Sequence, residues 1–232
     1  MVSAMGEGAG YNLNNLLIHA RNGEHRWAVG GMWDEIGALT FAYLRDHGLT
    51  TSSSVLDIGC GALRVGVHLI DFLDPGGYFG VDPVLELMEA GYDVELADQG
   101  LQDALDRSHL SQTAVFDFGA LPLKRPVDIA FAQSVFSHLP INDLRLCLTN
   151  LASVTVAGAR MFATVFLAPD LPAWSTPITH PRDGVTTYPT RNPFHFHESD
   201  LVHCTRELPW NFESVVDWSH PRDQMMATFV RV

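Results

Sequence analysis

The chain has 232 residues, of which 47% are hydrophobic and 18% are charged, so it can bury a full core and suits one domain with additions. Its formal net charge is −13, and it has only 14 lysine and arginine residues, which opposes binding to nucleic acid or to an acidic membrane surface. We therefore expect neither a nucleic acid nor a membrane as a partner.

Two helices are expected before the first strand. Residues 11–20 place leucines and an alanine on one helical face, and the Asn22-Gly23 pair is a turn signal that ends this helix. The second helix carries an apolar stripe over residues 36–44, and Gly48 follows at the position of a left-handed cap.

Residues 55–66 are typical of a strand, a glycine turn and a helix. The apolar run at residues 55–58 suits a strand buried on both faces, and Gly59 and Gly61 end it where the backbone must turn tightly or approach a ligand. Helical spacing of apolar residues then continues to Leu73. This order is typical of the entry to a Rossmann-like nucleotide site.

A second strand at residues 78–81 ends at Asp82, about 20 residues beyond the glycines, where nucleotide-binding folds place a carboxylate on ribose hydroxyls. A helix is expected over residues 83–90, with Gly91 as its stop. The polar and acidic residues 92–110 are most simply a solvated helical face.

Three further strands are expected in the core. Residues 113–116 form the third and end at Asp117, residues 127–132 form the fourth, and residues 160–166 form the fifth. The fourth strand delivers the polar segment 133–138 to the carboxyl edge of the sheet. Ligands bind at that edge because the strand order reverses there and leaves a crevice.

A proline-rich stretch, residues 168–193, follows the fifth strand without sustained periodicity. A loop of this length in a compact domain is commonly a lid over a substrate, so we interpret it as the main source of specificity. Trp174 and Tyr188 are expected either to line an acceptor pocket or to anchor the loop to the surface.

The end of the chain is expected to form a β-hairpin. Two β-rich runs, residues 213–219 and 224–230, flank a short segment in which His220 and Arg222 are interpreted as turn residues.

The glycine turn lacks the details of a diphosphate site. A dinucleotide fingerprint requires glycine or alanine three residues after its second glycine, and that position is Arg64. No Gly-Lys-Ser or Gly-Lys-Thr ending is present, and Asp57, two residues before the first glycine, would repel a pyrophosphate. A cationic cofactor fits this turn better.

The Asp-x-Gly-x-Gly pattern formed by Asp57, Gly59 and Gly61, followed by an acidic residue at the end of the second strand, resembles the class I S-adenosylmethionine-dependent methyltransferases over about residues 55–166. The resemblance implies an α/β fold with a Rossmann-like seven-stranded, mostly parallel sheet, helices on both faces and an antiparallel last strand. It also implies S-adenosyl-L-methionine as cofactor and S-adenosyl-L-homocysteine as product.

The resemblance further implies a set of cofactor-binding residues. Asp82 is expected to hold the ribose hydroxyls, and Asp117 is expected to hold the adenine amino group with Phe118 beside the ring. Trp33 is expected to close on the cofactor. Capping of a turn is the alternative role of Asp117, and ordinary packing is that of Trp33. The complete set is Trp33, Asp57, Gly59, Cys60, Gly61, Arg64, Asp82, Pro83, Asp117, Phe118, Gln133 and Ser134.

His138 is the first candidate for a base that deprotonates an acceptor hydroxyl. It follows the fourth strand, and the unperturbed pKa of a histidine lies close to neutral. It is equally placed to cap the helix expected at residues 141–152.

His195 and His197 are the other base candidates, because they alternate like strand residues near the edge of the sheet. Together with Glu198 they have the composition of a divalent metal site. We do not favour a metal, since Ser199 and Asp200 are typical of a helix cap and first turn, which makes Glu198 a solvated helix-end carboxylate.

The expected organisation has four parts: an N-terminal helical cover (1–54), a cofactor-binding core (55–168), a lid over the acceptor (169–198), and a C-terminal helix and hairpin that complete the sheet (199–232). The expected function is methyl transfer to an oxygen, or less readily a nitrogen, of a small-molecule, natural-product or sugar acceptor. A non-catalytic S-adenosylmethionine-binding module and a nicotinamide-dependent oxidoreductase are the alternatives, and Arg64 disfavours the second.

The three cysteines are far apart in the sequence and are not typical of a disulfide framework or a zinc site. No apolar run approaches the length that spans a bilayer, and the first residues have neither the basic start nor the apolar segment of a signal peptide. We therefore expect a cytoplasmic protein.

Overall fold

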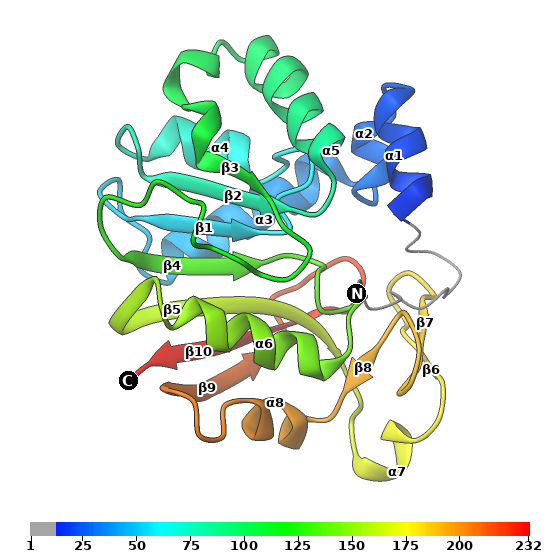
Figure 1. Cartoon of the computed structure of the whole chain (residues 1–232). Helices are drawn as coiled ribbons and strands as arrows, with labels where there is room; N and C mark the ends of the chain where they lie inside the picture. The colour runs from blue at the N-terminus through cyan, green and yellow to red at the C-terminus, as the bar shows by residue number, and fades with distance from the viewer. Residues whose placement is uncertain (1–12) are drawn as a thin grey trace.

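A large mixed sheet organises the computed structural model, which describes residues 13–232. Its strands are Val55–Ile58 (β1), Tyr78–Asp82 (β2), Leu110–Gln112 (β3), Val127–Ala132 (β4), Thr155–Leu167 (β5), His195–Phe196 (β8), Trp210–Val216 (β9) and Met225–Arg231 (β10). The order across the sheet is β3-β2-β1-β4-β5-β10-β9, and the short β8 pairs with the end of β5 (Figure 1).

The direction of the strands confirms the expected fold class. β3, β2, β1, β4 and β5 are parallel to one another, whereas β10 is antiparallel to both β5 and β9. The last strand of the chain is therefore inserted between two strands of the opposite direction. β1 and β2 are buried along their whole length, as expected for strands that are covered on both faces.

Helices cover both faces of the sheet. In Figure 1, α6 and α8 lie in front of it and α3 lies behind it. The helices are Leu13–Arg21 (α1), His25–Ala28 (α2), Trp33–Asp46 (α3), Gly66–Phe72 (α4), Leu85–Ala90 (α5), Ile141–Leu151 (α6), Leu171–Trp174 (α7) and Glu198–Cys204 (α8). None of the helices in residues 13–232 is long and apolar enough to cross a membrane.

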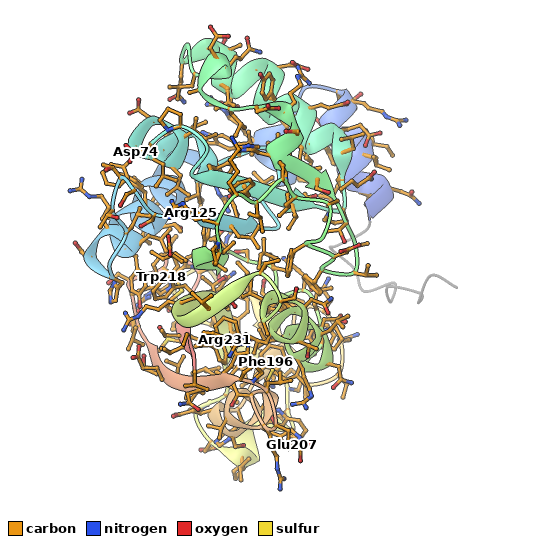
Figure 2. All side chains as sticks on the ribbon, turned by 60° about the vertical axis from the view of Figure 1, so that its left-hand side comes forward. Asp74, Arg125, Phe196, Glu207, Trp218 and Arg231 are labelled. Atoms are coloured by element: carbon orange, nitrogen blue, oxygen red, sulfur yellow. The ribbon has the colours of Figure 1, made fainter. Side chains whose placement is uncertain are left out.

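The hydrophobic core has one layer on each face of the sheet. One layer includes Leu148 of α6 and Leu201 of α8, and the other includes Leu44 of α3 and Leu69 of α4, all with no measurable exposure. Among the side chains of Figure 2, the labelled Phe196 belongs to the first layer and the labelled Trp218 to the second. This two-sided burial fixes the sheet as the rigid part of the molecule.

A buried carboxylate ties the N-terminal helices to the core. Glu95 is 1% exposed and accepts hydrogen bonds from His25 Nε2 at 2.6 Å and from Arg26 Nε at 2.7 Å. It lies in a π-helix, Gly91–Leu96 (η1), that continues α5. These bonds hold α2 against η1.

The third strand is not where the sequence analysis placed it. β3 ends at Gln112, and residues 113–116 form an irregular segment in which Phe116 has a φ of +54°. The apolar run there is not a strand, because Asn150 of α6 donates to the carbonyls of Val115 and Phe116 and takes the place of a strand partner. A short apolar run in the sequence does not by itself show whether the segment forms a strand.

Gly91 does not stop the helix before it. Its φ of −58° is helical, and the chain continues into η1. A Cβ at this position would lie 2.7 Å from the backbone of Ala62, so glycine is required here for the close approach of the helix to the turn after β1. The fifth strand is likewise longer than expected, since β5 begins at Thr155 and passes through Gly158.

Residues 168–193 form a folded insert that we call the lid. It contains α7 and a two-stranded hairpin of Ile178–Thr179 (β6) and Thr186–Thr187 (β7). Three ion pairs join the turn of this hairpin to the turn between β9 and β10. Arg182 pairs with Asp217 at 2.6 Å and with Asp223 at 3.0 Å, and Asp183 pairs with Arg222 at 3.3 Å.

Candidate active site

A cavity of about 590 Å³ lies at the carboxyl ends of β1, β2 and β4. Its walls also include the loop after α2, the lid, and the turn before β10. Its size falls within the range of small-molecule and cofactor sites. It brings together ten of the residues expected from the sequence, namely Asp57, Gly59, Cys60, Gly61, Arg64, Asp82, Pro83, Gln133, Ser134 and His138.

The turn after β1 requires both of its glycines. Gly59 and Gly61 have φ values of +75° and +51°, a region that side chains rarely adopt. A Cβ on Gly59 would lie 2.4 Å from Val135, and one on Gly61 would lie 2.7 Å from Val29. Because Gly59 and Gly61 have no Cβ, the side chains of Val135 and Val29 can pack directly against this turn in the cavity wall.

Asp82 joins the end of β2 to this glycine turn. Its carboxylate accepts from the backbone N–H of Gly61 at 2.9 Å and from that of Val84 at 2.8 Å. Asp82 is 4% exposed, and burial raises its pKa to about 6, against the lowering effect of those two hydrogen bonds. Two backbone N–H groups thus fix this carboxylate in the cavity wall.

Asp57 is a second buried carboxyl group of the cavity. The hydroxyl of Tyr78 donates to it at 2.9 Å. Burial raises the pKa of Asp57 to about 8, while the Tyr78 hydrogen bond lowers it and the nearby Asp82 raises it. Two carboxyl groups in one cavity favour a ligand that carries positive charge or donates hydrogen bonds.

Arg64 connects three parts of the site. Its Nη1 donates to the carbonyls of Val29 at 3.1 Å and Gly31 at 2.9 Å, and its Nη2 donates to the side-chain oxygen of Gln133. Burial and, to a smaller extent, the charge of Arg222 lower the pKa of Arg64 to about 10. The guanidinium therefore holds the loop after α2 against the end of β4.

A hydrogen-bond network fixes the segment after β4. The backbone N–H of Ser134 donates to Thr164 at 2.7 Å, and the Ser134 hydroxyl donates to Gln224 at 3.0 Å. Ser134 has a φ of +58°, which is rare outside glycine and is typical of functional sites. Gln133 donates from Nε2 to the same hydroxyl at 2.7 Å.

His138 lies in the cavity wall and contacts the lid. Its Nδ1 is 2.7 Å from the side-chain oxygen of Asn192. Burial lowers the pKa of His138, the hydrogen bond with Asn192 opposes this, and the charge of Arg222 lowers it further. The imidazole is therefore held neutral.

Three expected cofactor residues are not in the cavity wall. Trp33 is 9% exposed, and the guanidinium of Arg26 lies 5.0 Å from its ring centroid. Phe118 is buried in the core. Asp117 is exposed and accepts from the backbone N–H of Gly119 at 2.9 Å, which is the turn-capping alternative. Because β3 ends earlier than expected, Thr113, Ala114 and Phe116 line the cavity in their place.

The other two histidine candidates make structural contacts, His195 with the lid and His197 at the start of α8. His195 has no measurable exposure and makes hydrogen bonds of 2.9 Å with Thr187 and with the carbonyl of Trp174. His197, and not Ser199, is the N-cap of α8, where it accepts from the Ser199 N–H. Neither residue lines the cavity, and no cluster of three metal-ligating side chains occurs within residues 13–232.

Several cavity residues were not expected individually from the sequence, although Gly30 and Gly31 belong to residues 29–37, which we expected to fold over the cofactor. The cover contributes Trp27 and the Gly30-Gly31 pair, and the turn before β10 contributes Arg222, which had been interpreted as a turn residue only. The lid contributes Asp183, Val185 and Pro193, whereas Trp174 and Tyr188 do not line the cavity. Among these cavity residues, the Gly30-Gly31 pair was the one recognisable local pattern in the sequence.

The strand order and the inserted antiparallel strand define the fold of the class I S-adenosylmethionine-dependent methyltransferases. Solved structures share it at low sequence identity. Magnesium protoporphyrin IX methyltransferase (ChlM) from Synechocystis PCC 6803 with bound SAM has 15% identity and a TM-score of 0.54, over 98% of this chain and 87% of that one.

Two further structures carry the same fold. The mitomycin 7-O-methyltransferase MmcR has 13% identity and a TM-score of 0.61, over 97% of this chain and 62% of that one. The glycopeptide N-methyltransferase MtfA, complexed with S-adenosyl-L-homocysteine, has 12% identity and a TM-score of 0.59, over 84% of this chain and 90% of that one. No protein-family model matches the chain.

Proposed function

We propose that the protein is an S-adenosyl-L-methionine-dependent methyltransferase that transfers the methyl group to a hydroxyl oxygen of a small molecule. The observation that carries the proposal is the junction of Asp82 with Gly61 inside the cavity, at the edge of the sheet where β1 and β2 end. A carboxylate at this place suits ribose hydroxyls. The fold of the neighbours supports the same cofactor.

The residues of the cavity suit the parts of this cofactor. Asp82 would accept hydrogen bonds from the ribose, and Thr113, Ala114 and Phe116 would surround the adenine. Asp57 and the backbone of the glycine turn would face the methionine portion, whose positive charges suit two carboxyl groups. Bound S-adenosyl-L-methionine would supply a methyl group on a positively charged sulfur, already activated for displacement.

The chain itself then has to align the acceptor, exclude water and remove a proton. The loop after α2 and the lid close the cavity from two sides. Arg64 and Arg222 both hold that loop, since Arg222 Nη2 donates to the Gly30 carbonyl at 2.6 Å. Both arginines thus act as positioning residues for the cover.

The acceptor would enter beside His138. The cavity wall there combines this histidine with the apolar side chains of Leu139, Phe166, Val185 and Pro193. A buried neutral imidazole is able to take the proton from a hydroxyl as the oxygen is methylated. We propose oxygen as the acceptor atom because a hydroxyl must lose its proton to give a neutral product. The fold alone does not determine the acceptor atom, because one of the similar structures is named an O-methyltransferase and another an N-methyltransferase.

The proposal is tested by incubating the protein with radiolabelled S-adenosyl-L-methionine and a set of hydroxylated and amino compounds. We expect label transfer to a hydroxyl compound by the wild type and a loss of about a hundredfold in His138→Gln, with unchanged affinity for S-adenosyl-L-homocysteine. His47→Gln is the control, since His47 lies outside the cavity wall. Transfer to amines only, or equal rates in His138→Gln, would reject the oxygen assignment.

A further inference from the structure

The guanidinium of Arg222 contacts the two segments that close the cavity from opposite sides. Its Nη2 donates to the carbonyl of Gly30 in the loop after α2 at 2.6 Å, and its Nε lies 3.3 Å from the carboxylate of Asp183 in the lid. All three residues line the cavity. A Cβ at residue 30 would lie 2.9 Å from Nη1 of Arg222, so a glycine there allows the guanidinium to approach. One side chain therefore contacts the cover and the lid at once.

The turn of the lid hairpin and the turn before β10 form one unit. Arg182 donates to the Asp217 carboxylate from Nη1 at 3.1 Å and from Nη2 at 2.6 Å, and to the His220 carbonyl at 2.9 Å. Its backbone N–H donates to the Asp223 carboxylate at 2.7 Å. Because a bidentate pair fixes orientation as well as distance, the lid turn moves together with the turn that carries Arg222.

The turn of the lid hairpin depends on these contacts for its position. Residues 181–184 are exposed, and the flanking strands β6 and β7 have two residues each. Short exposed segments open locally at a small cost in free energy. The contacts with the turn before β10 therefore set how often this part of the lid opens.

A cofactor in the cavity would stabilise the other end of this link. The loop after α2 lines the cavity, and Arg64 already holds it from the side of the glycine turn. With the loop fixed, the Gly30 carbonyl keeps the guanidinium of Arg222 in one orientation. The ion pair with Asp183 then forms with a smaller loss of side-chain entropy, which stabilises the closed lid.

We propose that Arg222 is a positioning residue that couples the lid to the cover, so that a cofactor bound beneath the cover stabilises the lid over the acceptor part of the cavity. The inference rests on the proposed function, in which S-adenosyl-L-methionine occupies this cavity. The lid contributes Asp183, Val185 and Pro193 to the cavity wall, so the bound cofactor would complete the wall that the acceptor meets. Because such coupling is reciprocal, the acceptor would raise the affinity for the cofactor by the same factor.

The test is hydrogen–deuterium exchange of the full chain, read by mass spectrometry with and without saturating S-adenosyl-L-homocysteine. In the wild type, we expect the ligand to slow exchange about fivefold or more in residues 27–31 and also in residues 178–187. In Arg222→Met, the slowing should remain in residues 27–31, because Arg64 still binds the loop, and should fall below about twofold in residues 178–187. Arg182→Met breaks the other end of the link and is expected to give the same pattern.

Arg160→Met is the matched control. Arg160 also forms an ion pair of 3.3 Å, with Glu213, but lies outside the cavity wall, so the wild-type pattern should persist. Where an acceptor is found, Arg222→Met is expected to raise the KM for the acceptor about tenfold with a smaller change in kcat.

Two results would overturn the inference. One is a wild type in which the ligand slows exchange in residues 27–31 and leaves residues 178–187 unchanged. The other is full slowing of residues 178–187 in both Arg222→Met and Arg182→Met. Failure of S-adenosyl-L-homocysteine to bind would instead reject the proposed function. The link would still be read in the free protein, where Arg182→Met is expected to speed exchange in residues 27–31, although the described partners of Arg182 lie in residues 217–223.

Discussion

Arg64 Nη1 lies 2.9 Å from the carbonyl oxygen of Gly31, and it also donates to the carbonyl of Val29. Arg222 holds the carbonyl between them, that of Gly30, at 2.6 Å. Three consecutive carbonyls of the cover thus bind two guanidinium groups, one from the turn after β1 and one from the turn before β10. The cover is fixed over the cavity by charge-assisted hydrogen bonds, which are the stronger kind.

Replacement of Arg64 is expected to loosen this cover. Arg64→Gln removes the charge and at least one of the two carbonyl contacts, and hydrogen bonds to charged groups contribute about 1.5–3 kcal/mol. We expect the affinity for S-adenosyl-L-homocysteine to fall about tenfold or more, with faster proteolysis near Gly30. Calorimetry and limited trypsin digestion measure the two effects. Arg45→Gln, outside the cavity wall, is the control; normal affinity in Arg64→Gln would show that the cover is not needed for binding.

The two cavity carboxyl groups predict a pH dependence. The pKa values of Asp82 and Asp57 are raised to about 6 and about 8, above the value of 3.8 for an ordinary aspartate. Folded protein then binds more protons than unfolded protein in this range. The two groups therefore contribute fully to the free energy of unfolding below about pH 4. The contribution of Asp82 is lost as the pH rises through about 6, and that of Asp57 as the pH rises through about 8.

Ligand binding should show the opposite trend, because ribose hydroxyls donate best to an ionised carboxylate. We expect the affinity for S-adenosyl-L-homocysteine to increase between about pH 5 and about pH 7.5 as Asp82 ionises. Thermal-shift titrations across this range measure the effect, and Asp82→Asn should flatten it. An affinity that is equal at both ends of the range in the wild type would contradict the role given to Asp82.

Gly59 should be intolerant of a side chain. Gly59→Ala places a Cβ 2.4 Å from Val135 Cγ2 at a φ of +75°. Backbone strain and overpacking together are expected to lower the free energy of unfolding by about 2 kcal/mol or more. In the double variant with Val135→Ala, part of that loss should return because the contact is relieved while the strain remains. Urea unfolding compares the variants, and full stability in Gly59→Ala would refute the steric argument.

Asp117 should not contribute to cofactor binding. Its carboxylate caps a turn through Gly119, and the side chain lies outside the cavity wall. We therefore expect Asp117→Ala to change the affinity for S-adenosyl-L-homocysteine less than twofold, with a loss of about 1 kcal/mol in stability from the missing cap. A loss of affinity comparable to that of Asp82→Asn would restore the adenine role that the sequence indicated.

The candidate site residues that follow from local sequence lie together in the cavity wall, and their roles in binding stay predictions. The order of apolar strand, glycine turn and acidic strand end determined the places of Asp57, Gly61 and Asp82, because the backbone itself brings them to one sheet edge. The C-terminal hairpin was also expected from two β-rich runs and a turn, and the resemblance to the methyltransferases implied an antiparallel last strand.

The misplaced residues depend on tertiary contacts that leave no periodic signal. Asn150 of α6 donates to the carbonyls of Val115 and Phe116, so the segment expected as a strand is a loop, and Asp117 and Phe118 lie outside the cavity wall. Arg222 belongs to the site only because the turn before β10 folds back to Gly30, 192 positions away. No local pattern predicts a contact over that separation.

Calorimetric titration with S-adenosyl-L-homocysteine tests the central claim most directly, with Asp82→Asn as the variant and NADH as the competing ligand. We expect micromolar binding of S-adenosyl-L-homocysteine by the wild type, a loss of about tenfold or more in Asp82→Asn, and no binding of NADH. Binding of NADH in place of S-adenosyl-L-homocysteine, or equal affinity in the wild type and Asp82→Asn, would contradict the account.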